Sequence, residues 1–253
     1  MRVGLIGSGN MARALARGWG EPVLCTDGGS GRAEALAAEL GGEAIVSNAE
    51  LARRVDLVVL CHKPVQLPAV AEEVRPHAKA VASVLAAPPQ MQREAYPGTS
   101  VFCFLPNTPV EVRRGVICAA PTPGADAALE ARVNELFGRL GAVVTLPDHL
   151  MVPATATAGV GPAYLALVIE AQVDAAVRRG LPAGQAAALA VETMAGTAEL
   201  LAARGHDTLA VRREVASPGG STARGLAALE RRGLRTAFQE AMDAVIDGAP
   251  VPR

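Results

Sequence analysis

A glycine-rich hexad near the start of the chain, Gly-Ser-Gly-Asn-Met-Ala at positions 7–12, has the residue types and spacing of a phosphate-binding turn. An apolar run from Val3 to Ile6 precedes it and predicts a strand, and a helical pattern from Met11 to Trp19 follows. A strand, a tight turn and a helix in this order place a dinucleotide pyrophosphate at the helix N-terminus, where free N–H groups and the helix dipole favour an anion. The predicted cofactor contacts of this turn are Gly7, Ser8, Gly9, Asn10 and Met11.

The small residues of the hexad have separate roles. Gly7 permits the tight turn, Gly9 lets the backbone approach the phosphates, and Ala12 allows the helix to pack closely on the strand. Glycine-rich turns also occur without a ligand, so the position of the hexad directly after an apolar strand is what favours a bound dinucleotide.

Asp27 follows the next predicted strand, Pro22 to Thr26, about 20 residues after the glycine turn, where an acidic residue normally holds the ribose hydroxyls of NAD. The loop 28–32 adds a serine hydroxyl and the guanidinium of Arg32, which suit the 2′-phosphate of NADP. If Asp27 points at the ribose we expect NADH, and if it turns away we expect NADPH.

The stretch Cys61-His62-Lys63-Pro64 lies at the end of a continuous apolar strand, Asp56 to Cys61. Ligands of open parallel sheets collect at the carboxyl ends of the strands, so His62, Lys63 and Pro64 are candidate cofactor contacts. Lys63 would approach an anionic substrate or the cofactor phosphates, and Pro64 would fix the loop. The alternative is a solvated lysine in an ordinary loop.

Two more loops carry polar groups that suit ligand binding. Asn107 stands between Pro106 and Pro109, in a stiff loop that suits an amide orienting a ring or a backbone group, although an ordinary turn has the same composition. The stretch Ser-Pro-Gly-Gly-Ser-Thr at 217–222 opens a predicted helix and offers backbone N–H and hydroxyl donors for a carboxylate. A loop with helix-capping residues is the alternative for this stretch.

The elements that position these residues fall into two parts. Residues 1–145 alternate short apolar runs with helical patterns, which is typical of βαβ units in a parallel sheet, with Asn48 as a candidate helix cap. From 151 to 246 the strand signal almost disappears and alanine- and leucine-rich helical patterns dominate, the longest at 162–179 and 183–204. We predict an N-terminal Rossmann-type domain at 1–147 and an all-α dimerisation and substrate domain at 148–253.

Composition limits the classes of function. The chain has 253 residues, half of them hydrophobic, and a net charge of −1, so nothing favours a nucleic-acid partner. No apolar run approaches the roughly 20 residues needed to span a bilayer, so no membrane partner is expected. Cys25, Cys61, Cys103 and Cys118 have no metal-binding spacing, so we predict no metal site and a reducing cytoplasm.

Taken in order, these stretches resemble the pyrroline-5-carboxylate reductase family. The resemblance covers essentially the whole chain and runs through Gly7 to Met11, Lys63-Pro64, Pro106 to Pro109, Gly161 to Tyr164, Glu170-Ala171 with Asp174-Ala175, and Ser217 to Gly220. It implies a Rossmann domain, a helical domain that forms a homodimer or a larger homo-oligomer, and reduction of the small molecule 1-pyrroline-5-carboxylate to proline, the last step of proline synthesis. It also implies NADPH or NADH as the cofactor, with NADPH slightly favoured.

The resemblance assigns roles to individual residues. The N–H groups around Gly219, Gly220 and Ser221, with the Thr222 hydroxyl, would bind the substrate carboxylate, and Ser217 belongs to the same loop. Lys63 would add positive potential nearby, and Asn107 would lie against the cofactor. No residue is clearly a general acid, so either solvent or Thr222 would serve.

The chain departs from the family on the substrate side. The usual Ser-Gly-Ser-Gly-Pro-Ala-Tyr reads Ala158-Gly-Val160-Gly-Pro-Ala-Tyr, an arginine usual before Pro106 is missing from 102–104, and the usual Ala-Gly-Ile reads Ala-Ala-Pro at 86–88. A common glutamate also falls at Gly205. Lost donors reduce selectivity for the matching substrate, so another cyclic imine or a non-catalytic relative remains open. A hydroxyacid dehydrogenase is less favoured, because no lysine occurs from 162 to 204.

Overall fold

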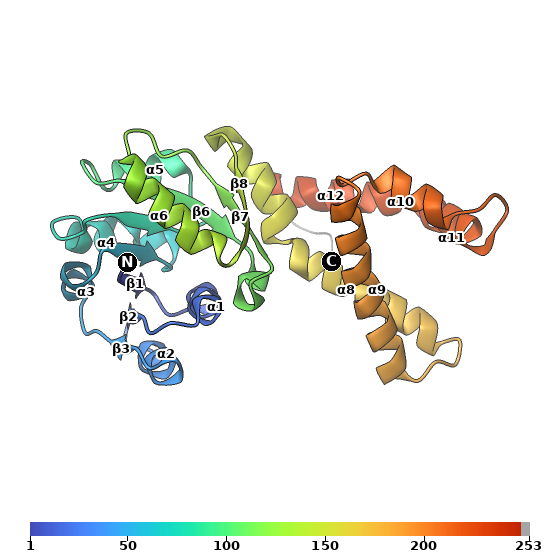
Figure 1. The fold of residues 1–253 in the computed structure, drawn as a ribbon, viewed down its shortest axis with the longest axis horizontal. Coiled ribbons are helices and arrows are strands. Elements are labelled where there is room, and N and C mark those ends of the chain that lie inside the picture. The colour runs from blue at the N-terminus through green and yellow to red at the C-terminus, as the bar shows by residue number, and fades with distance from the viewer. Residues whose placement is uncertain (249–253) are drawn as a thin grey trace. The chain divides into compact units, whose positions relative to one another are not determined.

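The computed structural model describes residues 1–248, which form two compact units (Figure 1). The first unit is Met1–Pro162 and the second begins at Ala163. The predicted domain boundary lies earlier, between 147 and 148. The stretch after 147 belongs to the first unit because Met151, Ala154 and Ala158 pack into its core. The boundary between the functional domains stays a prediction.

The first unit is built on an eight-stranded sheet with the order β3-β2-β1-β4-β5-β6-β7-β8. Its strands are parallel except where β6 meets β7. The strands are β1 (Val3–Ile6), β2 (Leu24–Thr26), β3 (Glu43–Ala44), β4 (Leu57–Leu60), β5 (Val81–Ser83), β6 (Val101–Pro106), β7 (Gly115–Ala119) and β8 (Gly141–Thr145). The order 3-2-1-4-5-6 has its switch point between β1 and β4, which is the Rossmann arrangement and confirms the predicted fold class.

Helices cover both faces of the sheet, so the central strands are apolar on both sides, as in β4, where all four residues are buried (Figure 1). Leu57 and Val59 face one core and Val58 and Leu60 face the other, because side chains alternate along a strand. The helices are α1 (Asn10–Trp19), α2 (Arg32–Leu40), α3 (Asn48–Arg54), α4 (Leu67–Val74), α5 (Pro89–Glu94), α6 (Ala127–Gly138) and α7 (Met151–Ala154). Residues of α1, α2 and α6 pack into the first core, and those of α3 and α4 into the second.

The prediction that Asn48 caps a helix is wrong. Ser47 is the N-cap of α3, and its side chain accepts a hydrogen bond from the N–H of Glu50 at 3.2 Å, whereas Asn48 is the first helical residue. The Asn48 amide has other partners: its Oδ1 accepts from Thr26 Oγ1 at 2.7 Å and its Nδ2 donates to Glu73 at 2.9 Å. Both residues are good caps, so the sequence alone did not decide between neighbours.

The second unit is helical throughout the part that the structure describes. Its helices are α8 (Gly161–Val177), which begins in the last residues of the first unit, α9 (Ala183–Ala203), α10 (Thr208–Val215), α11 (Ser221–Arg231) and α12 (Leu234–Asp247). Tyr164 of α8 meets Phe238 of α12 edge-on, with ring centroids 6.4 Å apart. The long predicted helices are confirmed within two residues, and α10 was not predicted.

The helices of the second unit leave much apolar surface uncovered. Leu167 is 63% exposed and Leu189 58% exposed, although both lie on long apolar helices. By length and composition alone, the stretches Asp148–Val177 and Ala183–Ala203 are able to cross a membrane, so the expectation that no stretch reaches that length is wrong. Two such helices are weak support for a membrane protein, because helices buried in a soluble assembly have the same composition.

Candidate functional site

The glycine turn joins β1 to α1 at the carboxyl edge of the sheet. Gly7 has a φ of +94°, and a Cβ at this position would lie 2.8 Å from the backbone nitrogen of His62, so the turn needs glycine for both conformation and space. The turn is tied to β2, because the Gly7 N–H and the Ser8 hydroxyl both donate to the carbonyl of Thr26 at 3.0 Å. These bonds fix the orientation of the residues that follow.

Gly9 is the N-cap of α1, with a φ of −76° that any residue adopts. A Cβ at Gly9 would meet nothing within 4 Å, so open space lies in front of the helix N-terminus. The first-turn N–H groups of α1 have no acceptors within their own helix and are directed out of that end. The arrangement fits the pyrophosphate of a dinucleotide, because the backbone can approach an anion there without a side chain in between.

A cavity of about 550 Å³ lies at this edge of the sheet. Ile6 is paired with Thr26 and Leu60, and Leu60 with Ser83, so the ends of β1, β2, β4 and β5 align and the loops after them line one cavity. The lining includes these predicted contacts: Gly7, Ser8, Gly9, Asn10, Met11, Asp27, Arg32, His62, Lys63 and Pro64. The structure thus gathers predicted contacts from three separate parts of the chain, 7–11, 27–32 and 62–64, around a single cavity.

The Asp27 carboxylate turns into its own loop. Its Oδ1 accepts from the N–H groups of Gly29 and Ser30 at 2.7 and 3.2 Å. Its Oδ2 accepts from the Ser30 hydroxyl at 2.8 Å and from the N–H groups of Arg32 and Ala33 at 2.7 and 3.1 Å. A carboxylate has about four lone-pair sites, so five donors leave no acceptor capacity for a ribose hydroxyl.

These hydrogen bonds lower the pKa of Asp27. Burial raises the pKa, but hydrogen bonds from the Ser30 hydroxyl and from the N–H groups of Ala33, Gly29 and Arg32 outweigh burial and lower the pKa to about 2. The carboxylate is therefore ionised at neutral pH and sits at the N-terminus of α2, where a negative charge is favourable. Ser30 and Arg32 are exposed and belong to the cavity lining.

His62 lines the cavity, and one of its ring nitrogens is buried without a partner among residues 1–248. Its Nδ1 lies 2.9 Å from the carbonyl of Lys63, and because a carbonyl only accepts, Nδ1 carries the proton. Nε2 is then an acceptor, and it is buried with no hydrogen-bond partner among residues 1–248. Burial lowers the pKa of His62, opposed in part by the Lys63 carbonyl, so the ring is neutral near pH 7. A buried, unpaired acceptor beside the cavity fits a ligand donor.

Asn107 is the one predicted cofactor contact that does not line this cavity. It is 8% exposed and is not part of the cavity lining. Its Nδ2 donates to the carbonyl of Ala158 at 3.1 Å, and its Oδ1 accepts from the N–H of Val116 at 2.8 Å. The structure therefore assigns the amide to protein partners, and its contact with the cofactor stays a prediction.

In the second unit, the loop 217–220 leads directly into α11. Gly219 has a φ of +70°, which favours glycine, and Gly220 is the N-cap of the helix. Ser221 and Thr222 stand in the first turn, where N–H groups lack acceptors within the helix. Arg224 closes the loop, because its Nη1 donates to the Gly219 carbonyl at 2.8 Å. Free N–H groups at a helix N-terminus suit an anion, and the binding of a carboxylate by this loop stays a prediction.

Comparison with known proteins identifies the family. The family described as pyrroline-5-carboxylate reductase dimerisation matches residues 148–250, and the one described as NADP oxidoreductase, coenzyme F420-dependent, matches residues 2–87. The pyrroline-5-carboxylate reductase of Thermus thermophilus is 34% identical over 254 residues, which cover 96% of this chain and 95% of that protein. The Synechocystis enzyme is 33% identical over the same shares of both chains.

The chain belongs to the pyrroline-5-carboxylate reductase family. Solved structures agree. The Streptococcus pyogenes 1-pyrroline-5-carboxylate reductase has a TM-score of 0.89 at 26% identity and covers 98% of this chain and 97% of its own. The Plasmodium falciparum pyrroline carboxylate reductase with NADP bound has a TM-score of 0.87 at 26% identity, over 98% and 96%. The predicted family, its class of oxidoreductase and NADP as cofactor are confirmed.

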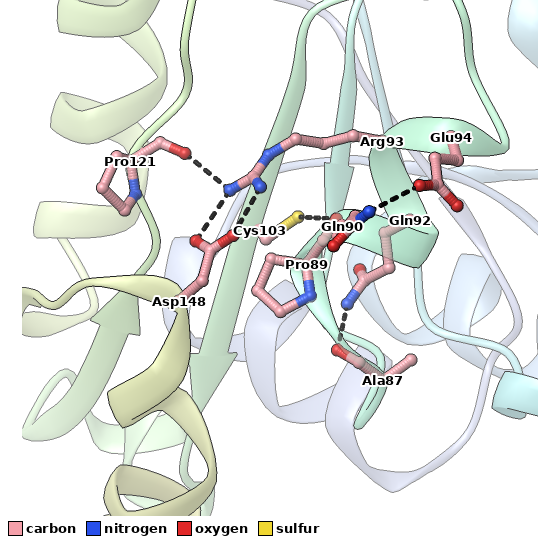
Figure 2. Close-up of polar contacts among 9 residues, drawn as sticks. All are labelled: Ala87, Pro89, Gln90, Gln92, Arg93, Glu94, Cys103, Pro121 and Asp148. Atoms are coloured by element: carbon pink, nitrogen blue, oxygen red, sulfur yellow. Dashed lines mark hydrogen bonds and ion pairs between the residues drawn. The ribbon is translucent and has the colours of Figure 1, made fainter.

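Within this member of the family, sequence reasoning missed one cluster on the first unit, at Arg93 (Figure 2). The Arg93 guanidinium forms two bonds to the Asp148 carboxylate, at 2.7 and 3.0 Å, and a third to the carbonyl of Pro121 at 2.8 Å. Arg93 lowers the pKa of Asp148. The cluster ties α5 to the start of the stretch that leads to α7. Arg93 and Asp148 are 55 positions apart, and no local pattern connects them.

Proposed function

We propose that this chain catalyses the NADPH-dependent reduction of the cyclic imine 1-pyrroline-5-carboxylate to L-proline. The observation that carries the proposal is the cavity at the sheet edge. Its glycine turn leaves open space at Gly9, and its lining residues include ten predicted cofactor contacts. Membership in the pyrroline-5-carboxylate reductase family supplies the substrate.

NADPH is favoured over NADH by the state of Asp27. In NAD-specific Rossmann sites a free carboxylate takes the ribose hydroxyls. Here both carboxylate oxygens are occupied by the loop 29–33, so Asp27 acts as the cap of α2 instead. The same bonds hold Ser30 and Arg32 at the cavity, where a hydroxyl and a guanidinium support a 2′-phosphate.

The remaining cofactor contacts follow from position. The N–H groups at Gly9, Asn10 and Met11 support the pyrophosphate at the N-terminus of α1. Lys63 stands in the loop after β4 and adds positive potential, while Pro64 begins the short 3₁₀ turn that shapes this loop. His62 Nε2 would accept a hydrogen bond from a cofactor hydroxyl or amide, which would satisfy its buried lone pair.

The substrate side rests on the loop 217–222 and on Val160. The N–H groups at Gly219, Gly220 and Ser221, with the Thr222 hydroxyl, would anchor the substrate carboxylate, and Ser217 would shape the loop. The imine is readily protonated, so the protein needs no nucleophile; it has to orient the substrate and exclude water. When bound, the nicotinamide supplies the hydride. Thr222 or solvent would deliver the proton to the ring nitrogen.

The assembly we propose is a homodimer, or a larger homo-oligomer, formed through the C-terminal helices and located in the cytoplasm. Leu165, Leu167, Leu189 and Val191 are between 46% and 63% exposed in the single chain. Apolar surface of this extent on α8 and α9 would be covered by a second copy. The match of residues 148–250 to a dimerisation domain supports this arrangement.

Steady-state assays of the purified protein test the proposal. We expect oxidation of NADPH with pyrroline-5-carboxylate, and at least tenfold weaker binding of NADH, since a lost charged hydrogen bond costs about 1.5–3 kcal/mol. Because Ala158 and Val160 lack the hydroxyls usual in the family, the assay includes the six-membered homologue, 1-piperideine carboxylate. Faster turnover of that imine would redirect the proposal to a different cyclic substrate, and no turnover of any imine would reject it.

A further inference from the structure

The stretch that leads from the first unit into α8 is irregular. Residues 151–154 are α-helical, 155–159 form a π-helical turn, and α8 begins at Gly161. The N–H of Val160 donates to the carbonyl of Thr155 at 3.2 Å, a bond that spans five residues and is typical of a π turn. Such turns are uncommon and occur often at functional sites.

Pro162 removes one hydrogen bond from this stretch. In a continuous α-helix the N–H of residue 162 would donate to the carbonyl of Ala158, four residues earlier. Proline has no N–H, so the Ala158 carbonyl loses its helical donor. Ala158 is partly buried and packs against the second core of the sheet, where an unpaired carbonyl is costly.

Asn107 supplies the missing donor. Its Nδ2 donates to the Ala158 carbonyl at 3.1 Å from a position 51 residues away in sequence. The other end of the amide is fixed as well, because Oδ1 accepts from the Val116 N–H at 2.8 Å, and the Asn107 N–H donates to the Val116 carbonyl at 3.1 Å. The side chain is therefore a rigid link between β7 and the π turn, and it is 8% exposed.

We propose that Asn107 is a positioning residue that replaces the hydrogen bond deleted by Pro162 and so holds the π turn, and Val160 directly after it, against the nucleotide-binding sheet. Ala156, inside the turn, is 2% exposed, which shows that the turn is packed and not a loose connection. The consequence for the reaction rests on the proposed function, in which Val160 lines the substrate side. The effect of Asn107 on the π turn itself does not depend on the proposed function.

The link predicts a specific rescue. Asn107→Asp keeps the shape of the side chain and an acceptor for Val116 but removes the donor to Ala158. Pro162→Ala restores a backbone N–H that can donate to the same carbonyl. In the double variant the two changes should compensate, because one carbonyl needs one donor. If the two substitutions caused unrelated structural defects, their destabilising effects would instead add in the double variant.

Hydrogen–deuterium exchange of the unliganded protein is the first measurement. We expect Asn107→Asp to speed exchange in the segment 155–163 about tenfold, which corresponds to about 1.4 kcal/mol, and the double variant to restore most of the protection. The control is Asn134→Asp, the same chemical change on the exposed face of α6, which should leave the segment unchanged. Unchanged exchange in Asn107→Asp, or no restoration in the double variant, overturns the proposal.

Kinetic measurements distinguish a positioning role of Asn107 from a general loss of structure in the variant. We expect Asn107→Asp to lower kcat/KM for the imine about tenfold while the Kd for NADPH stays within about twofold, because Asn107 does not line the cavity. Equal losses in NADPH binding and turnover would contradict a positioning role. If the wild-type chain does not reduce the imine, the proposed function fails and the exchange experiment alone decides the role of Asn107. Should the new carboxylate prevent folding, Asn107→Ala with and without Pro162→Ala carries the same test.

Discussion

Replacing Asp27 with asparagine tests whether this carboxylate serves its own loop or the cofactor ribose. In the folded chain its pKa falls from 3.8 to about 2, and at roughly 1.36 kcal/mol per tenfold change in proton affinity this gives at most about 2.4 kcal/mol of stability. Because Asp27 is only half-buried, solvent screening reduces the expected loss in Asp27→Asn to about 1–2 kcal/mol. The asparagine keeps one oxygen, but its Nδ2 cannot accept from Arg32 and Ala33.

The pH dependence makes the test selective. A carboxyl whose folded pKa is depressed stabilises the protein above its unfolded pKa and loses that contribution as the pH falls through the folded value. The difference in unfolding free energy between wild type and Asp27→Asn should therefore have its largest value at pH 7 and about half that value at pH 3. Urea unfolding at several pH values measures it.

A parallel binding experiment decides between the two roles. If Asp27 orders the loop 28–32, the variant should bind NADPH more weakly, because Ser30 and Arg32 lose their support. If the carboxylate instead held the ribose, the variant would keep its stability and lose affinity for NADH in particular. A stability difference that is absent, or that is the same at pH 3 and pH 7, refutes the reasoning.

Substitutions at four other positions give independent checks. Gly9→Ala should lower NADPH affinity at least tenfold with little change in Tm, because its methyl group enters open space at the phosphate site. Gly7→Ala should instead destabilise the fold by ~1 kcal/mol or more, because it forces an L-residue to a φ of +94° against the His62 backbone. Melting curves with and without NADPH separate the two effects. His62→Phe should weaken NADPH binding with only a small fall in Tm, since the ring loses one protein hydrogen bond, from Nδ1 to the Lys63 carbonyl, and Nε2 has no protein partner among residues 1–248; unchanged affinity in a titration would exclude a ligand contact. Arg93→Ala should destabilise the first unit by about 1–3 kcal/mol at pH 7, and the difference should shrink below about pH 4 as Asp148 is protonated, which urea unfolding would reveal; Arg93→Lys, which keeps the charge but not the two-pronged geometry, should lie in between.

The cofactor half was largely predictable because its determinants are local. The strand, turn and helix around Gly7 and Gly9 form one continuous stretch, and the carboxyl-end rule places Lys63 beside them. The fate of Asp27 was also within reach, because all its partners lie within six residues, in a loop whose glycines and Ser30 suit a side chain capping its own backbone. The sequence left open which way this carboxylate turns, and the choice between NADH and NADPH, which depends on it, required the geometry.

The links between distant segments were not predictable. Asn107 meets Ala158 across 51 positions, and Arg93 meets Asp148 across 55, so neither pair leaves a periodic or motif signal in a single sequence. The π turn at 155–159 also has a long-range partner, because the carbonyl of Ala158 accepts its hydrogen bond from Asn107. Composition likewise misjudged α8 and α9, since alanine and leucine mark an apolar helix without showing what covers it.

Transfer of deuterium from labelled NADPH tests the central claim most directly. The purified protein is mixed with pyrroline-5-carboxylate and NADPH carrying deuterium at the transferring C4 position, and the product is analysed by mass spectrometry and NMR. We predict L-proline with one deuterium on Cδ, the former imine carbon, formed in equal amount to the NADPH oxidised. Oxidation of NADPH without labelled proline, or no oxidation at high enzyme concentration, would contradict the assignment of this chain as a pyrroline-5-carboxylate-reducing enzyme.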